Sequence, residues 1–433
     1  MSDGRVSVQL GDVVAIQTGF PFKSSNYSDD QSDPKLLRGD NIAQGKVRWD
    51  GVKRWPTADT SGIDQYWLRE GDVILAMDRP WIEAGLKYCV IQSDDLPCLL
   101  VQRVARLRGQ KQLDNGFLRY VIGSQSFTEH VLAVQTGTAI PHISTKQIQS
   151  FHFDLPPLPK QRAIAATLGA LDDKIELNRR MNETLEAMAR ALFRDWFVDF
   201  GPTRAKMAGT TPYLSPDIWP HFPDRLDDEG KPEGWDFETV IDQADWINGA
   251  AYKNMHFSDA PDALPVIKIA ELKNGVTGNT AWTATDLGSR YLIDDGELLF
   301  SWSGNPDTSI DTFLWSGGKA WLNQHIFAVR ETGKRSKPFL HAMLKFLKPE
   351  FAELARNKQT TGLGHVTKAD MKRMLICTAP KSVHQAFDEL ITPIFDRAFL
   401  LQMESRTLAQ TRDLLLPKLI SREIHLSGAE SVV

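Results

Sequence analysis

The sequence has few cysteines and no long apolar run. Only three cysteines occur in 433 residues, at Cys89, Cys98 and Cys377, and no two of them form a CxxC pair. A disulfide framework and a zinc site are therefore not indicated, and we expect three reduced packing residues and no bound metal. The N-terminal stretch lacks the apolar segment of a signal peptide, and no later run reaches the length of a membrane span. We expect a cytoplasmic protein that does not contact a membrane.

An excess of basic residues is also missing. The chain carries 50 Lys and Arg against 55 Asp and Glu, which gives a formal net charge of -5. This balance argues against a protein that coats nucleic acid by bulk electrostatics, because counterion release requires many cations on one face. It leaves a local basic groove open. The hydrophobic content of 42% is that of a folded protein, and the length predicts two or more domains.

Motifs that would carry catalysis fail in their details. The segment Gly39–Val47 resembles a phosphate-binding loop, but it is one residue too long and ends in a valine where a magnesium-binding hydroxyl is required. The segment Asp154–Leu158 ("DLPPL") lacks the aromatic residue of an adenine methyltransferase loop. Asp262, Glu271 and Lys273 imitate a metal-dependent nuclease, but their spacing is short for that pattern. We therefore expect no catalytic residue.

The chain is organised as two copies of one domain. When the second half is laid on the first at a shift of about 230 residues, blocks of matching residues follow in the same order. "QTGTAIPHIS" (135–144) meets "QTTGLGHVTK" (359–368), and other matched pairs are Gly19 and Gly249, Lys23 and Lys253, Arg38 and Lys268, Gly71 and Gly296, Gln102 and Gln324, and Arg108 and Arg330. A period of this length indicates two homologous domains rather than a solenoid.

Runs such as "DVILAM" predict strands and segments such as "FLRYVIGSQSFTEHVLAV" predict helices, so each copy is a mixed α+β domain.

A long helix is predicted after each copy, because apolar residues recur there in alternating steps of three and four. A helix of about 40 residues spans about 60 Å, which is too long for its own domain to cover, so we expect the two helices to pack on each other. The predicted seam consists of Ile164, Leu168, Leu171, Ile175, Asn178, Asn182, Leu185, Ala189 and Leu192 in the first helix and Ile391, Ile394, Ala398, Leu401, Ser405, Leu408, Arg412, Leu415 and Leu419 in the second. Its polar positions cost stability but can fix the register. The alternative is two unrelated amphipathic core helices.

Three segments resemble one protein family. The stretch from "QTGTAIPHIS" to "RDWF" (135–197) is similar to the central conserved region of the specificity subunit of type I restriction-modification systems. The segment "TRDLLLPKLISREI" (411–424) is similar to the C-terminal counterpart of that region, and "GPTRAKM" with "FPDRL" resembles the linker between the repeats. The resemblance covers essentially the whole chain, and the sequences diverge in the body of each repeat.

The resemblance implies two target recognition domains, each of which reads one half of a bipartite, asymmetric site in double-stranded DNA. It implies that a pair of long antiparallel coiled-coil helices joins them with pseudo-two-fold symmetry and sets the spacer. Two modification (methyltransferase) subunits would dock on these helices, and restriction subunits would join the hetero-oligomer. S-adenosylmethionine, ATP and Mg would belong to those partners. This chain would be a non-catalytic subunit, without a cofactor, of an N6-adenine methyltransferase and ATP-dependent restriction endonuclease complex.

The predicted domain layout follows from the repeats and the helices. The two recognition domains are expected at 1–157 and 237–380, the two spacer helices at 158–200 and 381–425, and a Pro/Gly-rich linker at 201–236.

The candidate DNA contacts are polar and basic residues in predicted loops. Phosphate contacts are expected from Lys23, Arg38, Lys253 and Lys268. Base contacts are expected in segments that differ between the copies, because the half-sites differ. These segments carry Arg79 and Trp81 against Trp302, Ser303 and Asn305, and Gln102 with Arg103 against Gln324 with His325. The duplicated glycine-containing loop adds Thr136, Thr138, His142, Thr361 and His365. Each residue could instead form a surface ion pair or a capped turn, and either histidine could fix its loop by a hydrogen bond.

Two further alternatives stay open at this stage. The basic run with Arg330, Lys334, Arg335 and Lys337 either follows phosphates or forms a solvated turn. The chain as a whole could be a non-catalytic coiled-coil adaptor with two ligand- or protein-binding domains, which its acidic charge permits. A fusion that cuts or methylates DNA itself would need a further domain, for which the repeats leave no room.

Overall fold

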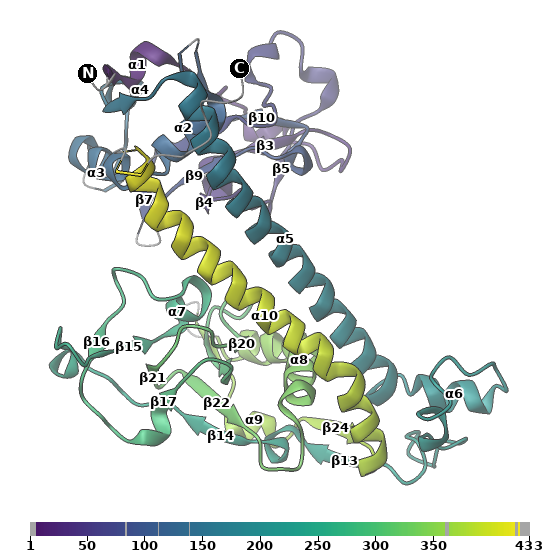
Figure 1. Cartoon of the computed structure of the whole chain (residues 1–433). Coiled ribbons are helices and arrows are strands. Elements are labelled where there is room, and N and C mark those ends of the chain that lie inside the picture. Colours follow the sequence, from purple (N-terminus) through teal and green to yellow (C-terminus); the bar gives the residue numbers. More distant parts are fainter. Residues whose placement is uncertain are drawn as a thin grey trace. The chain divides into compact units, whose positions relative to one another are not determined.

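The structure is a computed structural model that describes residues 6–82, 85–110, 112–137, 139–359, 363–420 and 423–424 (Figure 1). The chain divides into two compact units, one made of Met1–Lys174 with Leu408–Val433 and the other of Ile175–Thr407. Two helices of 40 residues each, α5 (Leu158–Phe197) and α10 (Lys381–Ile420), contribute to both units. Each unit therefore contains one repeat together with a part of both long helices.

The first unit is built around a five-stranded sheet and a three-stranded sheet. The five-stranded sheet has the order β2 (Val14–Thr18), β11 (Val104–Gly109), β6 (Val73–Ala76), β9 (Tyr88–Val90) and β4 (Gln44–Gly45). The three-stranded sheet has the order β10 (Cys98–Leu100), β3 (Lys35–Leu37) and β5 (Lys53–Arg54). The remaining elements are the antiparallel pairs β1 (Val6–Gln9) with β12 (His152–Leu155) and β7 (Trp81–Ile82) with β8 (Gly85–Leu86), and the helices α1 (Leu10–Val13), α2 (Asn115–Ile122), α3 (Gln125–Val134) and α4 (Thr145–Gln149).

The second unit repeats this plan with two four-stranded sheets. One sheet has the order β14 (Asp245–Asn248), β22 (Ile326–Arg330), β18 (Leu298–Ser301) and β20 (Asp311–Leu314), and the other has the order β16 (Trp282–Thr283), β15 (Leu264–Ile267), β21 (Ala320–Leu322) and β17 (Leu292–Ile293). The remaining elements are the antiparallel pairs β13 (Asp236–Thr239) with β24 (Leu375–Thr378) and β19 (Ser303–Gly304) with β23 (Gly364–His365), and the helices α6 (Gly201–Met207), α7 (Ile269–Asn274), α8 (Lys337–Asn357) and α9 (Lys368–Met371). The predicted α+β class, with two homologous domains and two long helices, is confirmed.

The matched glycines explain why the repeat is visible in the sequence. A Cβ atom added to Gly19 would lie 2.2 Å from the carbonyl oxygen of Val101, and one added to Gly249 would lie 2.2 Å from that of Asn323. Both positions require glycine, because another strand's backbone passes at this point in each copy.

The helices predicted from "FLRYVIGSQSFTEHVLAV" are two, α2 and α3, which are separated at Gly123 and Ser124. The Ser124 hydroxyl accepts a hydrogen bond from the Phe127 backbone at 3.2 Å and so caps α3.

Each long helix belongs to both cores. At the start of α5, Ile164 and Leu168 are buried in the core of the first unit, whereas Phe193 and Trp196 at its other end are buried in the core of the second unit. In α10, Ile391 is buried in the core of the second unit and Leu419 in the core of the first. The prediction that the helices mainly cover each other is therefore incomplete, because the domain cores bury their ends.

The two helices also contact each other within each unit, and they run antiparallel (Figure 1). In the first unit, Arg412 Nη1 donates to Asp172 Oδ1 at 2.8 Å. In the second unit, Asn178 Nδ2 donates to Glu404 Oε2 at 2.8 Å. All the predicted seam residues are buried or half-buried. Asp172 precedes Asn178 in α5, whereas its partner Arg412 follows Glu404 in α10, so the two helices run in opposite directions.

The segment expected to be a linker is packed. Phe222 and Trp235 are buried in the core of the second unit, and the Trp196 and Phe222 rings are 4.8 Å apart. The exact domain boundaries given above remain a prediction. Among the described residues, every helix is too short or too polar to cross a membrane.

Candidate nucleic-acid interface

Four of the predicted DNA contacts of the first unit meet at one place. The loop after β6 carries Asp78 and Arg79, and Arg103 immediately precedes β11. Asp78 Oδ1 lies 2.7 Å from His142 Nδ1 and 3.7 Å from Arg103 Nη1. Thr136 and His142 exchange backbone hydrogen bonds of 2.9 and 2.7 Å, which closes the duplicated loop at this point. The structure thus places Arg103 and His142 at one carboxylate, and backbone hydrogen bonds bring Arg79 and Thr136 to the same loop.

Two of these residues have strained backbones. Arg79 has φ 45° and Arg103 has φ 66°, in the left-handed region that non-glycine residues rarely adopt. Such a conformation costs about 1–3 kcal/mol per residue and persists only where the surroundings hold it. For Arg79 the surroundings include a backbone hydrogen bond to Pro141 O at 2.7 Å. Burial lowers the pKa of the neighbouring Lys87, and repulsion from Arg79 is among the further causes.

The second unit builds the same backbone arrangement. Met77 N donates to Arg103 O at 2.9 Å in the first unit, and Trp302 N donates to His325 O at 3.4 Å in the second. Ile143, which follows His142, donates its backbone N–H to Met77 O at 2.9 Å. Val366, which follows His365, donates its backbone N–H to Trp302 O at 2.8 Å. The two sites therefore share these backbone hydrogen bonds around Met77 and Trp302, although Arg103 has a positive φ and its counterpart His325 does not.

The side chains at these equivalent positions differ. The pair of Asp78 and His142 corresponds to the pair of Ser303 and His365, which face each other between β19 and β23. Arg103 corresponds to His325, whose ring lies 5.5 Å from the Trp302 ring. Trp302 Nε1 donates to Asn248 Oδ1 at 2.9 Å. Hence the two copies present different hydrogen-bonding groups on one shared framework.

The remaining candidates lie on the surface of their own unit. Lys23 and Lys253 are exposed and precede equivalent 3₁₀ turns, Ser24–Asn26 and Asn254–His256. Gln102 and Gln324 are exposed in equivalent turns.

Three other candidates already have partners. Arg38 Nη2 lies 3.1 Å from Asp40 Oδ2, and Lys268 Nζ lies 5.3 Å above the Phe257 ring. The Asn305 amide oxygen accepts hydrogen bonds from two backbone N–H groups and so forms a capped turn. Thr138 and Thr361 lie outside the described residues.

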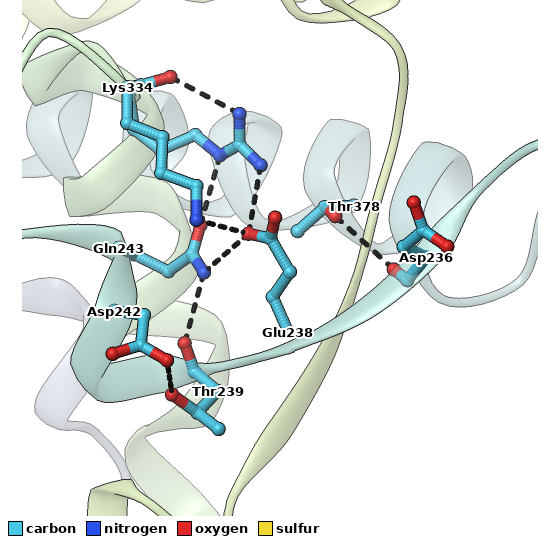
Figure 2. A network of polar contacts seen from close by, with 8 residues as sticks. Asp236, Glu238, Thr239, Asp242, Gln243, Lys334 and Thr378 are labelled. Carbon is cyan, nitrogen blue, oxygen red and sulfur yellow. Dashed lines mark hydrogen bonds and ion pairs between the residues drawn. The ribbon is translucent and has the colours of Figure 1, made fainter.

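The basic run is paired within the second unit. Glu238 Oε2 lies 2.8 Å from Lys334 Nζ and 3.3 Å from Arg335 Nη2, and Gln243 Nε2 donates to the same oxygen (Figure 2). Arg330 Nε donates to Glu297 Oε1 at 2.6 Å. These cations stabilise the unit itself, so they do not form a free phosphate track.

The nuclease-like carboxylate also has a structural role. Glu271 accepts from the Lys268 backbone at 3.0 Å and from Thr280 Oγ1 at 3.2 Å, which caps α7. Among the described residues, no three His, Cys, Asp or Glu side chains lie close enough to hold a metal ion. The three cysteines are free and buried, and burial raises the pKa of the Cys98 thiol to about 12.

Residues 3–187 and 232–398 match the sequence model of the type I restriction modification DNA specificity domain. The chain belongs to this family. The two matched ranges contain the two repeats, and each includes one of the two loop sites described above.

Individual relatives agree with this assignment. The MjaVIII specificity subunit of Methanocaldococcus jannaschii is 33% identical over 41% of this chain and 42% of its own length. The EcoAI specificity subunit of Escherichia coli is 35% identical over 40% of this chain and 29% of its own length, so both alignments cover less than half of each relative. The HindI specificity subunit of Haemophilus influenzae is 25% identical over 71% of this chain and 77% of its own length.

A solved structure shares the fold. The S subunit of a type I restriction-modification system from M. genitalium superposes with a TM-score of 0.53 at 12% identity, over 97% of both chains.

Sequence reasoning missed Asp78 and Asn248, which orient the predicted residues at the two sites. The pairing of Asp78 with the repeated His142 through an antiparallel bridge is not visible in either segment alone. The duplication gave the only available signal, since Asp78 follows a matched strand and differs from its counterpart.

Proposed function

We propose that this chain is the DNA-sequence-specificity subunit of a type I restriction-modification complex, in which each repeat reads one half of a bipartite, asymmetric DNA site. The observation that carries this proposal is the duplicated loop site, where matching backbone hydrogen bonds surround Asp78 and Arg103 in one copy but Ser303 and His325 in the other. A shared framework with different polar groups suits two readers of different half-sites. Family membership supports the same conclusion.

The proposed subunit performs no chemistry itself. Two modification subunits dock on α5 and α10, and restriction subunits complete the complex. S-adenosylmethionine, ATP and Mg bind to those partners, and the complex acts in the cytoplasm. The lengths of α5 and α10 support a role in setting the spacer, because 40 residues of helix extend about 60 Å, or between one and two turns of DNA at about 34–36 Å per turn.

The exposed lysines at equivalent turns, Lys23 and Lys253, are proposed phosphate contacts, and so is Lys268. They position the DNA without specifying its sequence. The loop sites around Arg103 and around Trp302 are the proposed base readers.

Mapping of N6-methyladenine across the genome tests the proposal. A host expresses the cognate modification subunit with or without this chain, and the two maps are compared. We expect a bipartite motif that is present only with the chain. Unchanged methylation, or methylation of one undivided motif, contradicts the proposal and favours a coiled-coil adaptor instead.

A further inference from the structure

Asp78 contacts two of the predicted DNA-reading residues of the first domain. Its Oδ1 atom lies 2.7 Å from His142 Nδ1 and 3.7 Å from Arg103 Nη1, and its side chain is 39% exposed. Because a carboxylate only accepts hydrogen bonds, His142 Nδ1 carries the proton of this contact. The other ring nitrogen, Nε2, can then bind a further partner.

A carboxylate at this position is unfavourable for plain phosphate binding. At such short distances its charge offsets a large part of the attraction that Arg103 exerts on a phosphate. What a carboxylate does provide is direction. It accepts a hydrogen bond from one edge of the His142 ring and attracts the Arg103 guanidinium at 3.7 Å, which favours one orientation of each side chain.

The backbone supports a specific role for the neighbouring arginines. Arg79 and Arg103 have φ of 45° and 66°, whereas the position equivalent to Arg79 in the second copy is Gly304, with φ 118°. Glycine adopts positive φ without strain, so an arginine at such a position is a cost that folding alone does not require. Both arginine side chains are exposed.

On the basis of the proposed function, we propose that Asp78 is the positioning residue of the first recognition domain. It orients Arg103 and His142, which together with Arg79 read a half-site that contains guanine. The arginine fork matches the O6 and N7 acceptors of guanine in the major groove. The second domain has a serine, a glycine and a histidine at the positions of Asp78, Arg79 and Arg103, so it reads its half-site without arginine at this location.

Two variants of the complete complex with its modification subunits separate orientation from charge. Asp78→Asn keeps the shape of the side chain and removes its charge, and Arg103→Lys keeps the cation and removes the fork. We measure methylation rates on DNA fragments in which each guanine of the motif is replaced by adenine. We expect both variants to lose about 5- to 150-fold of discrimination at guanines of one half-site, with the other half-site unchanged.

Ser303→Ala is the matched control, because it changes the equivalent position of the second domain. We expect it to leave discrimination in the half-site affected by Asp78→Asn unchanged. Unfolding midpoints equal to that of the unmodified chain exclude a general loss of folding, and Arg103, whose side chain is 61% exposed, provides a second variant should Asp78→Asn fold poorly.

Three results overturn the inference. The first is unaltered discrimination in both variants. The second is slower methylation at all sites without a change of motif, which would assign the cluster to phosphate binding. The third is a wild-type motif whose half-sites contain no guanine affected by either variant. If the wild-type complex produces no bipartite motif at all, the proposed function fails instead.

Discussion

Asn178 offers a test of how the helix pair balances stability against register. Its side chain is 0% exposed, and Nδ2 donates to Glu404 Oε2 at 2.8 Å. Its Oδ1 atom is buried and has no hydrogen-bond partner among the described residues. A buried acceptor without a partner costs about 1–3 kcal/mol. Replacement of this amide by an apolar side chain of similar size is therefore expected to stabilise the second unit.

The magnitude follows from three contributions to Asn178→Leu. Removal of the unpartnered acceptor recovers about 1–3 kcal/mol, and burial of the leucine side chain adds up to about 1.5–3 kcal/mol. Loss of the hydrogen bond to the carboxylate costs about 1.5 kcal/mol, at the low end of its range because Glu404 is exposed and water can replace the amide. Imperfect fit of the larger side chain takes back part of this gain, so we expect a net stabilisation of about 1–2 kcal/mol.

Urea unfolding of the full-length chain, followed by tryptophan fluorescence, measures this effect. Thr184→Leu is the matched control because Thr184 is exposed on the same helix, and we expect its effect to stay within about 0.5 kcal/mol. If Asn178→Leu lowers stability by more than about 1 kcal/mol while the control is neutral, the buried amide stabilises the pair and the reasoning is wrong.

Three further predictions concern the cores and the acid stability. Phe193→Ala removes a ring that is 1% exposed and packs among other phenylalanines, and we expect urea unfolding to show a loss of about 3–5 kcal/mol. Arg108→Met leaves its carboxylate partner, which is only 3% exposed, without a counter-charge, and we expect a loss of about 3 kcal/mol in the same assay. Burial lowers the pKa of His384 to about 3 in the folded chain, whereas this histidine has a pKa of about 6.5 in the unfolded chain. Between these two pH values the unfolded chain therefore binds one proton more than the folded chain. The contribution of the neutral His384 to the free energy of unfolding is then fully present above about pH 6.5 and is lost as the pH drops toward about 3. We expect His384→Phe to make the free energy of unfolding less dependent on pH in this range.

Controls for these variants come from exposed residues. Met188→Ala, on the same helix as Phe193, and Arg225→Met, in an exposed ion pair, are expected to leave the unfolding midpoint unchanged. A midpoint for Phe193→Ala or Arg108→Met that matches its control contradicts the assigned packing or pairing. If the free energy of unfolding falls equally steeply with decreasing pH in His384→Phe and in the unmodified chain, this histidine does not cause the loss of stability in acid.

The duplication and the fold class could be predicted because backbone requirements leave traces in both copies. Gly19 and Gly249 are both needed where a neighbouring strand passes, and Arg108 and Arg330 both pair with the acidic residue that follows a matched glycine. A shared physical constraint at equivalent positions restricts both copies to the same residue type. Such constraints can be read by comparing the chain with itself.

Contacts between distant segments could not be predicted in this way. The basic run around Arg335 was open to two interpretations, and only the fold shows that Glu238, almost one hundred positions earlier, pairs with Lys334 and Arg335. The burial of Phe193 in the second core is equally absent from the heptad pattern, since the pattern identifies an apolar face but not what covers it.

The two copies separate the residues that build the framework from those that distinguish one reader from the other. The framework ion pairs, Arg108 with Asp72 and Arg330 with Glu297, keep one chemistry in both copies. At the loop site, an equally well-defined backbone carries Asp78 in one copy and Ser303 in the other. Backbone hydrogen bonding gives no reason for this difference, because Met77 and Trp302, which precede Asp78 and Ser303, make matching backbone hydrogen bonds. The chemistry of what each loop contacts gives such a reason, so base contacts are best sought where the equivalent backbones agree and their side chains do not.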